Sequence, residues 1–142
     1  MQSFVCGTRL SFGADAPAAL AGLHAERVLL VTDPYFAENG TAARYAAAFP
    51  GAQVEIFSDV APDPPLSLVA QGVARLQALR PDTLLALGGG SAIDCAKGIA
   101  ALGGLPVRLV AVPTTSGSGS EVTSFAILTQ GGVKHPLVDP AL

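Results

Sequence analysis

The chain has 142 residues and a net charge of −3, from 8 basic and 11 acidic residues, and this length is typical of one domain with its own core. The basic residues form no block, so we expect no nucleic acid partner, and no apolar run reaches the roughly 18 residues of a membrane span. Charged residues make up only 13% of the chain, which predicts that another domain or subunit covers part of the surface. The amino terminus lacks a secretory signal pattern, and we therefore expect a cytoplasmic protein.

The amino-terminal third of the chain predicts a hairpin, a helix and a first buried strand. Residues 3–13 have the pattern of two short strands. Residues 15–23 follow as a helix with Asp15 as its N-cap. Residues 27–33, RVLLVTD, form a continuous apolar run of the kind that is buried on both faces of a parallel sheet. An alanine-rich helix with an interruption near Gly40 comes next.

Strand and helix alternate through the rest of the chain. Strands are expected over residues 52–60, 82–87 and 107–113, and a helix over residues 66–80. A last β-like section, residues 122–135, turns at Gly131 and Gly132. This order predicts an α/β fold in which helices flank a parallel sheet, with a short amino-terminal β-hairpin.

A run of three glycines, Gly88 to Gly90, joins the strand at 82–87 directly to a helix-like pattern that starts near Ser91. Ser91 and Asp94 fit a capping box at that helix start. The unpaired amides and the dipole of the helix, with no side chains in front of them, would suit a phosphate or pyrophosphate. The alternative is a tight turn that serves only packing, for which one glycine would suffice. Neither a P-loop nor a G-x-G-x-x-G fingerprint is present.

A second loop, PTTSGSGSE at residues 113–121, follows the next buried strand. Its hydroxyl side chains are Thr114, Thr115, Ser116, Ser118 and Ser120. Ligands of open parallel sheets bind outside the carboxyl ends of the strands, so both loops belong to the same edge. The alternative is an ordinary surface loop. A serine hydrolase is excluded, because no G-x-S-x-G elbow occurs.

Two acidic residues also follow predicted strands. Asp33 ends the strand at 27–33, where its carboxylate could accept hydrogen bonds from a ribose and repel a 2′-phosphate, favouring NAD over NADP. Equally, Asp33 could simply start the next helix. Asp63, at the end of the following strand, carries the same two interpretations.

Together these residues resemble the iron-containing (group III) alcohol dehydrogenase family. Its GGGSxxDxAK motif is matched from Gly88 to Lys97, and its PTTxGTGSEVT motif from Pro113 to Thr123, with Ser118 in place of the common threonine. The segments TRLSFG, PDPP and VAQGVARLQALRP most resemble the propanol dehydrogenases of bacterial propanediol utilisation.

The resemblance implies a Rossmann-like cofactor domain that binds NAD. Gly89, Gly90 and Ser91 would hold the pyrophosphate, Thr114, Thr115 and Thr123 would line the adenine and ribose side, and Lys134 would approach the nicotinamide ribose. Asp94 and Lys97 would support the pocket from the helix. Asp63 stands where many relatives have asparagine. The full set of implied cofactor residues is Asp33, Asp63, Gly88, Gly89, Gly90, Ser91, Asp94, Lys97, Thr114, Thr115, Ser116, Ser118, Thr123 and Lys134.

The family's catalytic metal, iron or sometimes zinc, is held by one aspartate and three histidines in a helical second domain. This chain has only His24 and His135, so the resemblance implies no catalytic and no metal-binding residue here. We therefore expect residues 1–142 to be an NAD-binding domain truncated from a two-domain enzyme and inactive alone. The full enzyme would interconvert a short primary alcohol such as 1-propanol and its aldehyde, as a homo-oligomer in the cytoplasm or in a bacterial microcompartment, with the second domain as packing partner.

Two other hypotheses remain at this point. The chain could be a stand-alone nucleotide-binding or assembly module without catalysis, and the coding sequence downstream of Leu142 would separate this from an enzyme fragment. It could also be a relative of the glycerol dehydrogenases or dehydroquinate synthases, but their second motifs differ from PTTSGSGSE.

Overall fold

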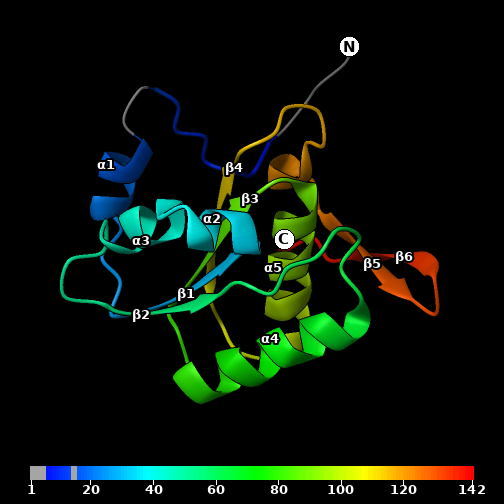
Figure 1. Ribbon diagram of the computed structural model, residues 1–142. Coiled ribbons are helices and arrows are strands. Elements are labelled where there is room, and N and C mark those ends of the chain that lie inside the picture. The colour runs from blue at the N-terminus through cyan, green and yellow to red at the C-terminus, as the bar shows by residue number, and fades with distance from the viewer. Residues whose placement is uncertain (1–5, 14–15) are drawn as a thin grey trace, which may run out of the picture.

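The computed structural model describes residues 6–13 and 16–142 (Figure 1). Its elements are, in chain order, α1 (Ala16–Ala21), β1 (Arg27–Thr32), α2 (Pro34–Glu38), α3 (Thr41–Ala46), β2 (Gln53–Phe57), α4 (Leu66–Leu79), β3 (Thr83–Gly88), α5 (Gly90–Gly103), β4 (Arg108–Pro113), the 3₁₀ helix η1 (Ser120–Val122), β5 (Phe125–Gln130) and β6 (Val133–Val138). Apart from its amino-terminal hairpin, the predicted alternation of strands and helices is confirmed.

The central sheet has the strand order β2-β1-β3-β4, and all neighbouring strands are parallel. β1 pairs with β2 on one side and with β3 on the other. The next strand in sequence, β2, therefore lies on one side of β1, and the later strands β3 and β4 lie on the opposite side. The carboxyl ends of β1 and β3 therefore form the topological switch point, where open α/β sheets leave a crevice for ligands.

Helices cover both faces of the sheet because alternate side chains of each buried strand point to opposite sides. Leu29 and Leu84 belong to the apolar cluster shared with α4 and α5. Leu30 and Leu85 belong to the cluster shared with α1, α2 and α3. Figure 1 shows these two groups of helices on opposite sides of the strands.

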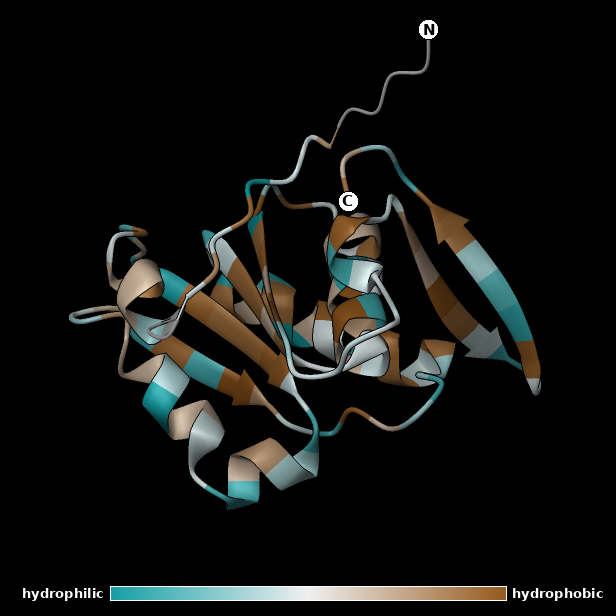
Figure 2. Cartoon of the chain, turned by 90° about the horizontal axis from the view of Figure 1, so that it is seen from above, coloured by the Kyte–Doolittle hydropathy of each residue, from teal (hydrophilic) through white to brown (hydrophobic). Residues whose placement is uncertain are grey.

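The β5–β6 hairpin stands apart from the central sheet (Figure 2). It is antiparallel and turns at Gly131 and Gly132, as the sequence predicts. Ala126 and Leu128 are buried, and Leu128 joins the cluster under α4 and α5. This packing places the hairpin beside α5, the helix that begins at the glycine run.

Some local predictions differ from the structure. Of the expected amino-terminal hairpin, residues 6–13 contain no strand, and its remaining residues lie outside the described part, as does the predicted N-cap Asp15. The interruption near Gly40 is confirmed, because Gly40 has a φ of 82° between α2 and α3.

Among the described residues, no helix combines the length and apolar character needed to cross a membrane.

Candidate functional site

Asp33 and Gly88 lie close together at the switch point of the sheet. Asp33 directly follows β1, and Gly88 ends β3. A Cβ atom added at Gly88 would lie 3.7 Å from Asp33 Oδ2 and only 2.7 Å from the Cβ of Ala92. Gly88 also has a φ of 149°, a conformation that side-chain-bearing residues rarely adopt. The backbone at this point of the crevice therefore requires glycine.

The second loop lies directly on the glycine turn. A Cβ at Gly89 would meet Thr115 Oγ1 at 3.1 Å, and one at Gly90 would meet the Cβ of Ser118 at 3.1 Å. Of the three glycines, only Gly88 would place a Cβ closer than 3.0 Å to a neighbour, whereas Gly89 and Gly90 face side chains of the exposed loop. The turn and the hydroxyl loop, predicted only to share an edge, are in contact.

The start of α5 has no side-chain cap. The helix begins at Gly90, and its N-cap Gly89 offers no side-chain bond to the first-turn amides. The Ala92 amide donates to the Gly89 carbonyl at 3.1 Å. The amides of Gly90 and Ser91 have no carbonyl one turn earlier to bond, and they carry the positive end of the helix dipole. The predicted capping box is absent, since Ser91 Oγ instead accepts a hydrogen bond from the Asp63 amide at 3.3 Å and Asp94 Oδ2 accepts one from the Ile127 amide at 3.2 Å.

Both interpretations of Asp33 are compatible with the geometry. Asp33 Oδ1 accepts a hydrogen bond from the Phe36 amide at 3.2 Å and so caps α2. Its other oxygen, Oδ2, would lie 3.7 Å from a Cβ at Gly88, the last residue of the neighbouring strand β3. One oxygen therefore starts the helix, while the second remains at the ligand edge.

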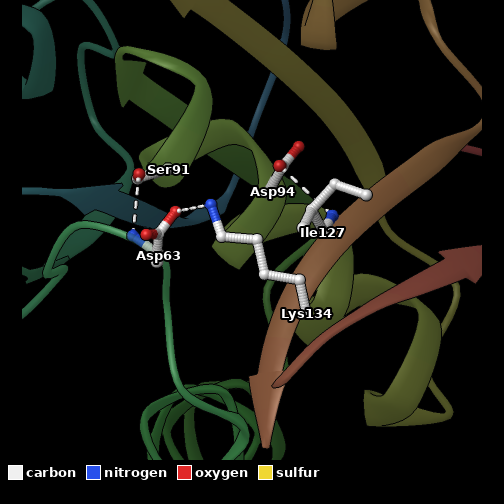
Figure 3. A network of polar contacts seen from close by, with 5 residues as sticks. All are labelled: Asp63, Ser91, Asp94, Ile127 and Lys134. Atoms are coloured by element: carbon white, nitrogen blue, oxygen red, sulfur yellow. Dashed lines mark hydrogen bonds and ion pairs between the residues drawn. The ribbon is translucent and has the colours of Figure 1, made fainter. Parts of the chain in front are cut away.

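Asp63 and Lys134 form an ion pair beside the start of α5 (Figure 3). Lys134 Nζ lies 2.7 Å from Asp63 Oδ1, and both side chains are 60% exposed. Asp63 has a φ of 51°, and its amide donates to Ser91, so the loop before α4 is tied to the first turn of α5. The pair links this loop to the β5–β6 hairpin across the site.

Asp94 and Lys97 are buried on the face of α5 that meets η1 and β5. Lys97 Nζ donates to the carbonyls of Thr123 and Phe125 and to the Thr123 hydroxyl. Burial lowers the pKa of Lys97, an effect opposed by the charges of Asp94 and Glu121. Burial has the opposite effect on the acid and raises the pKa of Asp94. Hydrogen bonds from Ile127 and Ser120 and the charge of Lys97 oppose this rise.

The remaining predicted residues differ in how they face the crevice. The Thr114 amide donates to the Gly88 carbonyl at 3.0 Å, and Ser116 lies exposed in the same loop. Thr123 points instead to α5, where its hydroxyl accepts from Lys97 and donates to the Ser120 carbonyl.

Two residues of the second motif have structural features to which the sequence assigned no role. Ser120 is buried, and its Oγ would lie 3.4 Å from a Cβ at Gly90. Glu121 Oε2 is buried without a hydrogen-bond partner in the described part of the chain. In the sequence, the only indication of a role for these two residues is that they directly follow the hydroxyl side chains of the loop.

A hollow of about 450 Å³ lies at the opposite, amino edge of the sheet, where its lining includes His24, Arg27 and Asp82. Asp82 Oδ2 already accepts hydrogen bonds from the amides of Glu26 and Arg27 there. No group of three or more histidine, cysteine, aspartate or glutamate side chains within residues 6–13 and 16–142 is arranged to hold a metal. We therefore place the candidate site at the carboxyl edge and assign no metal ligand.

Comparison with known proteins gives one consistent result. The family model described as iron-containing alcohol dehydrogenase matches residues 7–142. The chain is 39% identical to the 1-propanol dehydrogenase PduQ of Citrobacter freundii, with 100% of this chain and 40% of that protein covered. It is 36% identical to the PduQ of Salmonella typhimurium over the same shares. The chain thus spans about two-fifths of the length of these relatives.

Solved structures agree with the sequence matches. An iron-containing alcohol dehydrogenase from Thermococcus thioreducens superposes with a TM-score of 0.87 at 27% identity, covering 97% of this chain and 44% of that one. A sulfoacetaldehyde reductase from Bifidobacterium kashiwanohense, in complex with NAD+, gives a TM-score of 0.85 at 26% identity, covering 99% and 43%. The chain belongs to the iron-containing alcohol dehydrogenase family.

Proposed function

We propose that this chain is the NAD-binding domain of a metal-dependent alcohol dehydrogenase. The observation that carries the proposal is the meeting of Asp33, the glycine turn and the hydroxyl loop at the switch point of the sheet. A parallel sheet offers its ligand crevice there, and the uncapped start of α5 supplies amides suited to a diphosphate. The similarity to a reductase that was solved with NAD+ supports the choice of cofactor.

Individual residues have distinct roles in this proposal. The amides of Gly89, Gly90 and Ser91 bind the diphosphate, and Thr115 and Ser118 bind from the facing loop. Asp33 Oδ2 accepts hydrogen bonds from the adenosine ribose hydroxyls and repels a 2′-phosphate. Lys134 contributes positive charge near the nicotinamide ribose. Bound NAD supplies the hydride acceptor for alcohol oxidation.

We assign the alcohol, the metal and the assembly to the full-length parent enzyme. Its substrate is a short primary alcohol, in line with the names of the 1-propanol dehydrogenases that the chain resembles. Exposed apolar side chains, among them Phe12, Val133 and Val138, support a surface that other protein covers in the parent. We infer a homo-oligomer in the bacterial cytoplasm or a microcompartment.

Calorimetric titration with NAD and NADP tests the proposal. The wild-type chain should bind NAD more tightly than NADP by about tenfold or more, because the Asp33 carboxylate repels a 2′-phosphate. Asp33→Ser keeps an N-cap for α2 but removes the charge. This variant should therefore reduce the ratio of NAD affinity to NADP affinity, chiefly because it binds NADP more tightly.

Asp59→Ser, at an exposed position after β2, is the matched control and should keep the preference. Tighter binding of NADP than of NAD by the wild-type chain would contradict the role of Asp33. Failure of both nucleotides to bind would contradict the proposed function itself.

A further inference from the structure

α5 carries one acidic and one basic side chain in its buried face. Asp94 is 9% exposed and Lys97 only 2%. Charged groups are rarely buried to this degree unless they are hydrogen-bonded or paired. Both side chains are held by hydrogen bonds to another segment of the chain, so the position of that segment shows what they do.

The hydrogen bonds of Lys97 all go to the segment that follows the hydroxyl loop. Its ammonium has three N–H donors. These are matched by three acceptors, the carbonyl and hydroxyl oxygens of Thr123 and the carbonyl of Phe125, the last two at 3.1 and 3.0 Å. Lys97 thus has no donor left for a cofactor.

Asp94 holds the same segment from the same helix face. Its Oδ2 accepts the amide of Ile127 in β5 at 3.2 Å (Figure 3). Together Asp94 and Lys97 fix residues 123–127 to α5, the helix whose first turn forms the proposed diphosphate site.

The other end of the hydroxyl loop is fixed to the same unit. The Thr114 amide bonds the carbonyl of Gly88, directly before α5. Between the two attachments, Gly117 and Gly119 have φ values of 112° and 65°, and this stretch is largely exposed. The loop is rich in glycine and gains little stiffness from its own sequence, so its two attachments determine where Thr115 and Ser118 lie.

We infer that Asp94 and Lys97 are positioning residues, which hold the hydroxyl loop against the glycine turn before the cofactor binds and do not touch the cofactor themselves. This inference rests on the proposed function. A loop already ordered in its binding conformation costs less entropy on binding, and the affinity rises accordingly.

The test compares Asp94→Ala, which removes the acceptor of the Ile127 amide, and Lys97→Met with wild type. Each variant should weaken NAD binding by about tenfold. In the ligand-free chain, amide exchange of Val122, whose partner is the Gly119 carbonyl, should accelerate about tenfold relative to that of Leu85 in β3. Neither variant alters the backbone partner of Val122, so the faster exchange reports release of the loop.

Ile99→Val is the matched control. Ile99 is a fully buried α5 residue that packs in the core beside α4, and its truncation destabilises the fold without touching the loop. This variant should leave the affinity for NAD and the relative exchange of Val122 unchanged. Because the charge of Lys97 also interacts with that of Glu121, Lys97→Met can lose folded protein, in which case Asp94→Ala, which leaves Lys97 in place, decides the matter.

Weaker NAD binding with unchanged Val122 exchange would mean direct cofactor contact and would overturn the inference. Unchanged affinity in both variants would overturn it as well. If wild-type protein binds no NAD, the proposed function fails, and Val122 exchange in the variants still decides whether the two side chains hold the loop.

Discussion

At the scale of single residues, the glycine turn shows how packing and ligand access can require the same residue type. The sequence predicts a ligand because three glycines exceed the need of a simple turn. In the structure Gly88 abuts Ala92, Gly89 abuts Thr115 and Gly90 abuts Ser118. These contacts come from a loop that follows another strand, and no local pattern predicts them.

Gly88 and Gly89 should therefore respond differently to substitution by alanine. Gly88→Ala combines a disfavoured φ with a 2.7 Å contact to Ala92, and should cost about 2 to 4 kcal/mol of unfolding free energy. Gly89→Ala meets only Thr115, at a φ of −81°, and should cost less than about 1 kcal/mol. Urea unfolding followed by circular dichroism measures both.

NAD binding separates the two roles of the turn. Gly89→Ala should stay folded yet bind NAD about tenfold more weakly, because its methyl group displaces the facing loop and covers a binding amide. Equal destabilisation by the two substitutions, or full affinity in Gly89→Ala, would contradict this description of the turn.

At the scale of elements, the sequence predicts strands and helices well where their signal is local. The apolar runs of β1 and β3 and the break at Gly40 are of this kind. The capping box failed because Ser91 and Asp94 are engaged by the distant amides of Asp63 and Ile127. Long-range partners of this kind depend on the tertiary fold.

Asp82 is another long-range connection between elements. It precedes β3, and its Oδ2 accepts the amides of Glu26 and Arg27, at 2.7 and 3.0 Å, at the start of β1. Desolvation raises the pKa of Asp82, but these bonds, the Thr83 hydroxyl and the Arg108 charge together lower it below 3.8. The folded state thus favours the ionised form of Asp82. The contribution of this carboxylate to folding stability is present above pH 3.8 and is lost as the pH falls through the lowered pKa.

Asp82→Ala should lower the unfolding free energy at pH 7 by about 1 to 2 kcal/mol. Its difference from wild type should shrink as the pH falls from 3.8 through the lowered pKa of Asp82, because the carboxylate of the folded wild-type protein becomes protonated over that range. Urea unfolding across this pH range measures the difference, with the exposed Asp59→Ala as the control. A difference that stays constant with pH would show that the charge of Asp82 is not involved.

At the scale of the whole molecule, the order of the strands explains why two sequence motifs form one site. Parallel strands β1, β3 and β4 end at the same edge, so Asp33, the glycine turn and the hydroxyl loop meet there. This part of the site could be predicted from alternation alone. The Asp63–Lys134 pair could not, since it depends on where the β5–β6 hairpin packs.

The most direct test of the account is a two-dimensional NMR titration of the ¹⁵N-labelled chain with NAD. We predict that the largest amide shift changes fall on Gly89, Gly90, Ser91, Thr115 and Ser118, where the glycine turn meets the hydroxyl loop. Changes that cluster instead around the hollow at the amino edge, near His24 and Asp82, would contradict the assignment of the cofactor site.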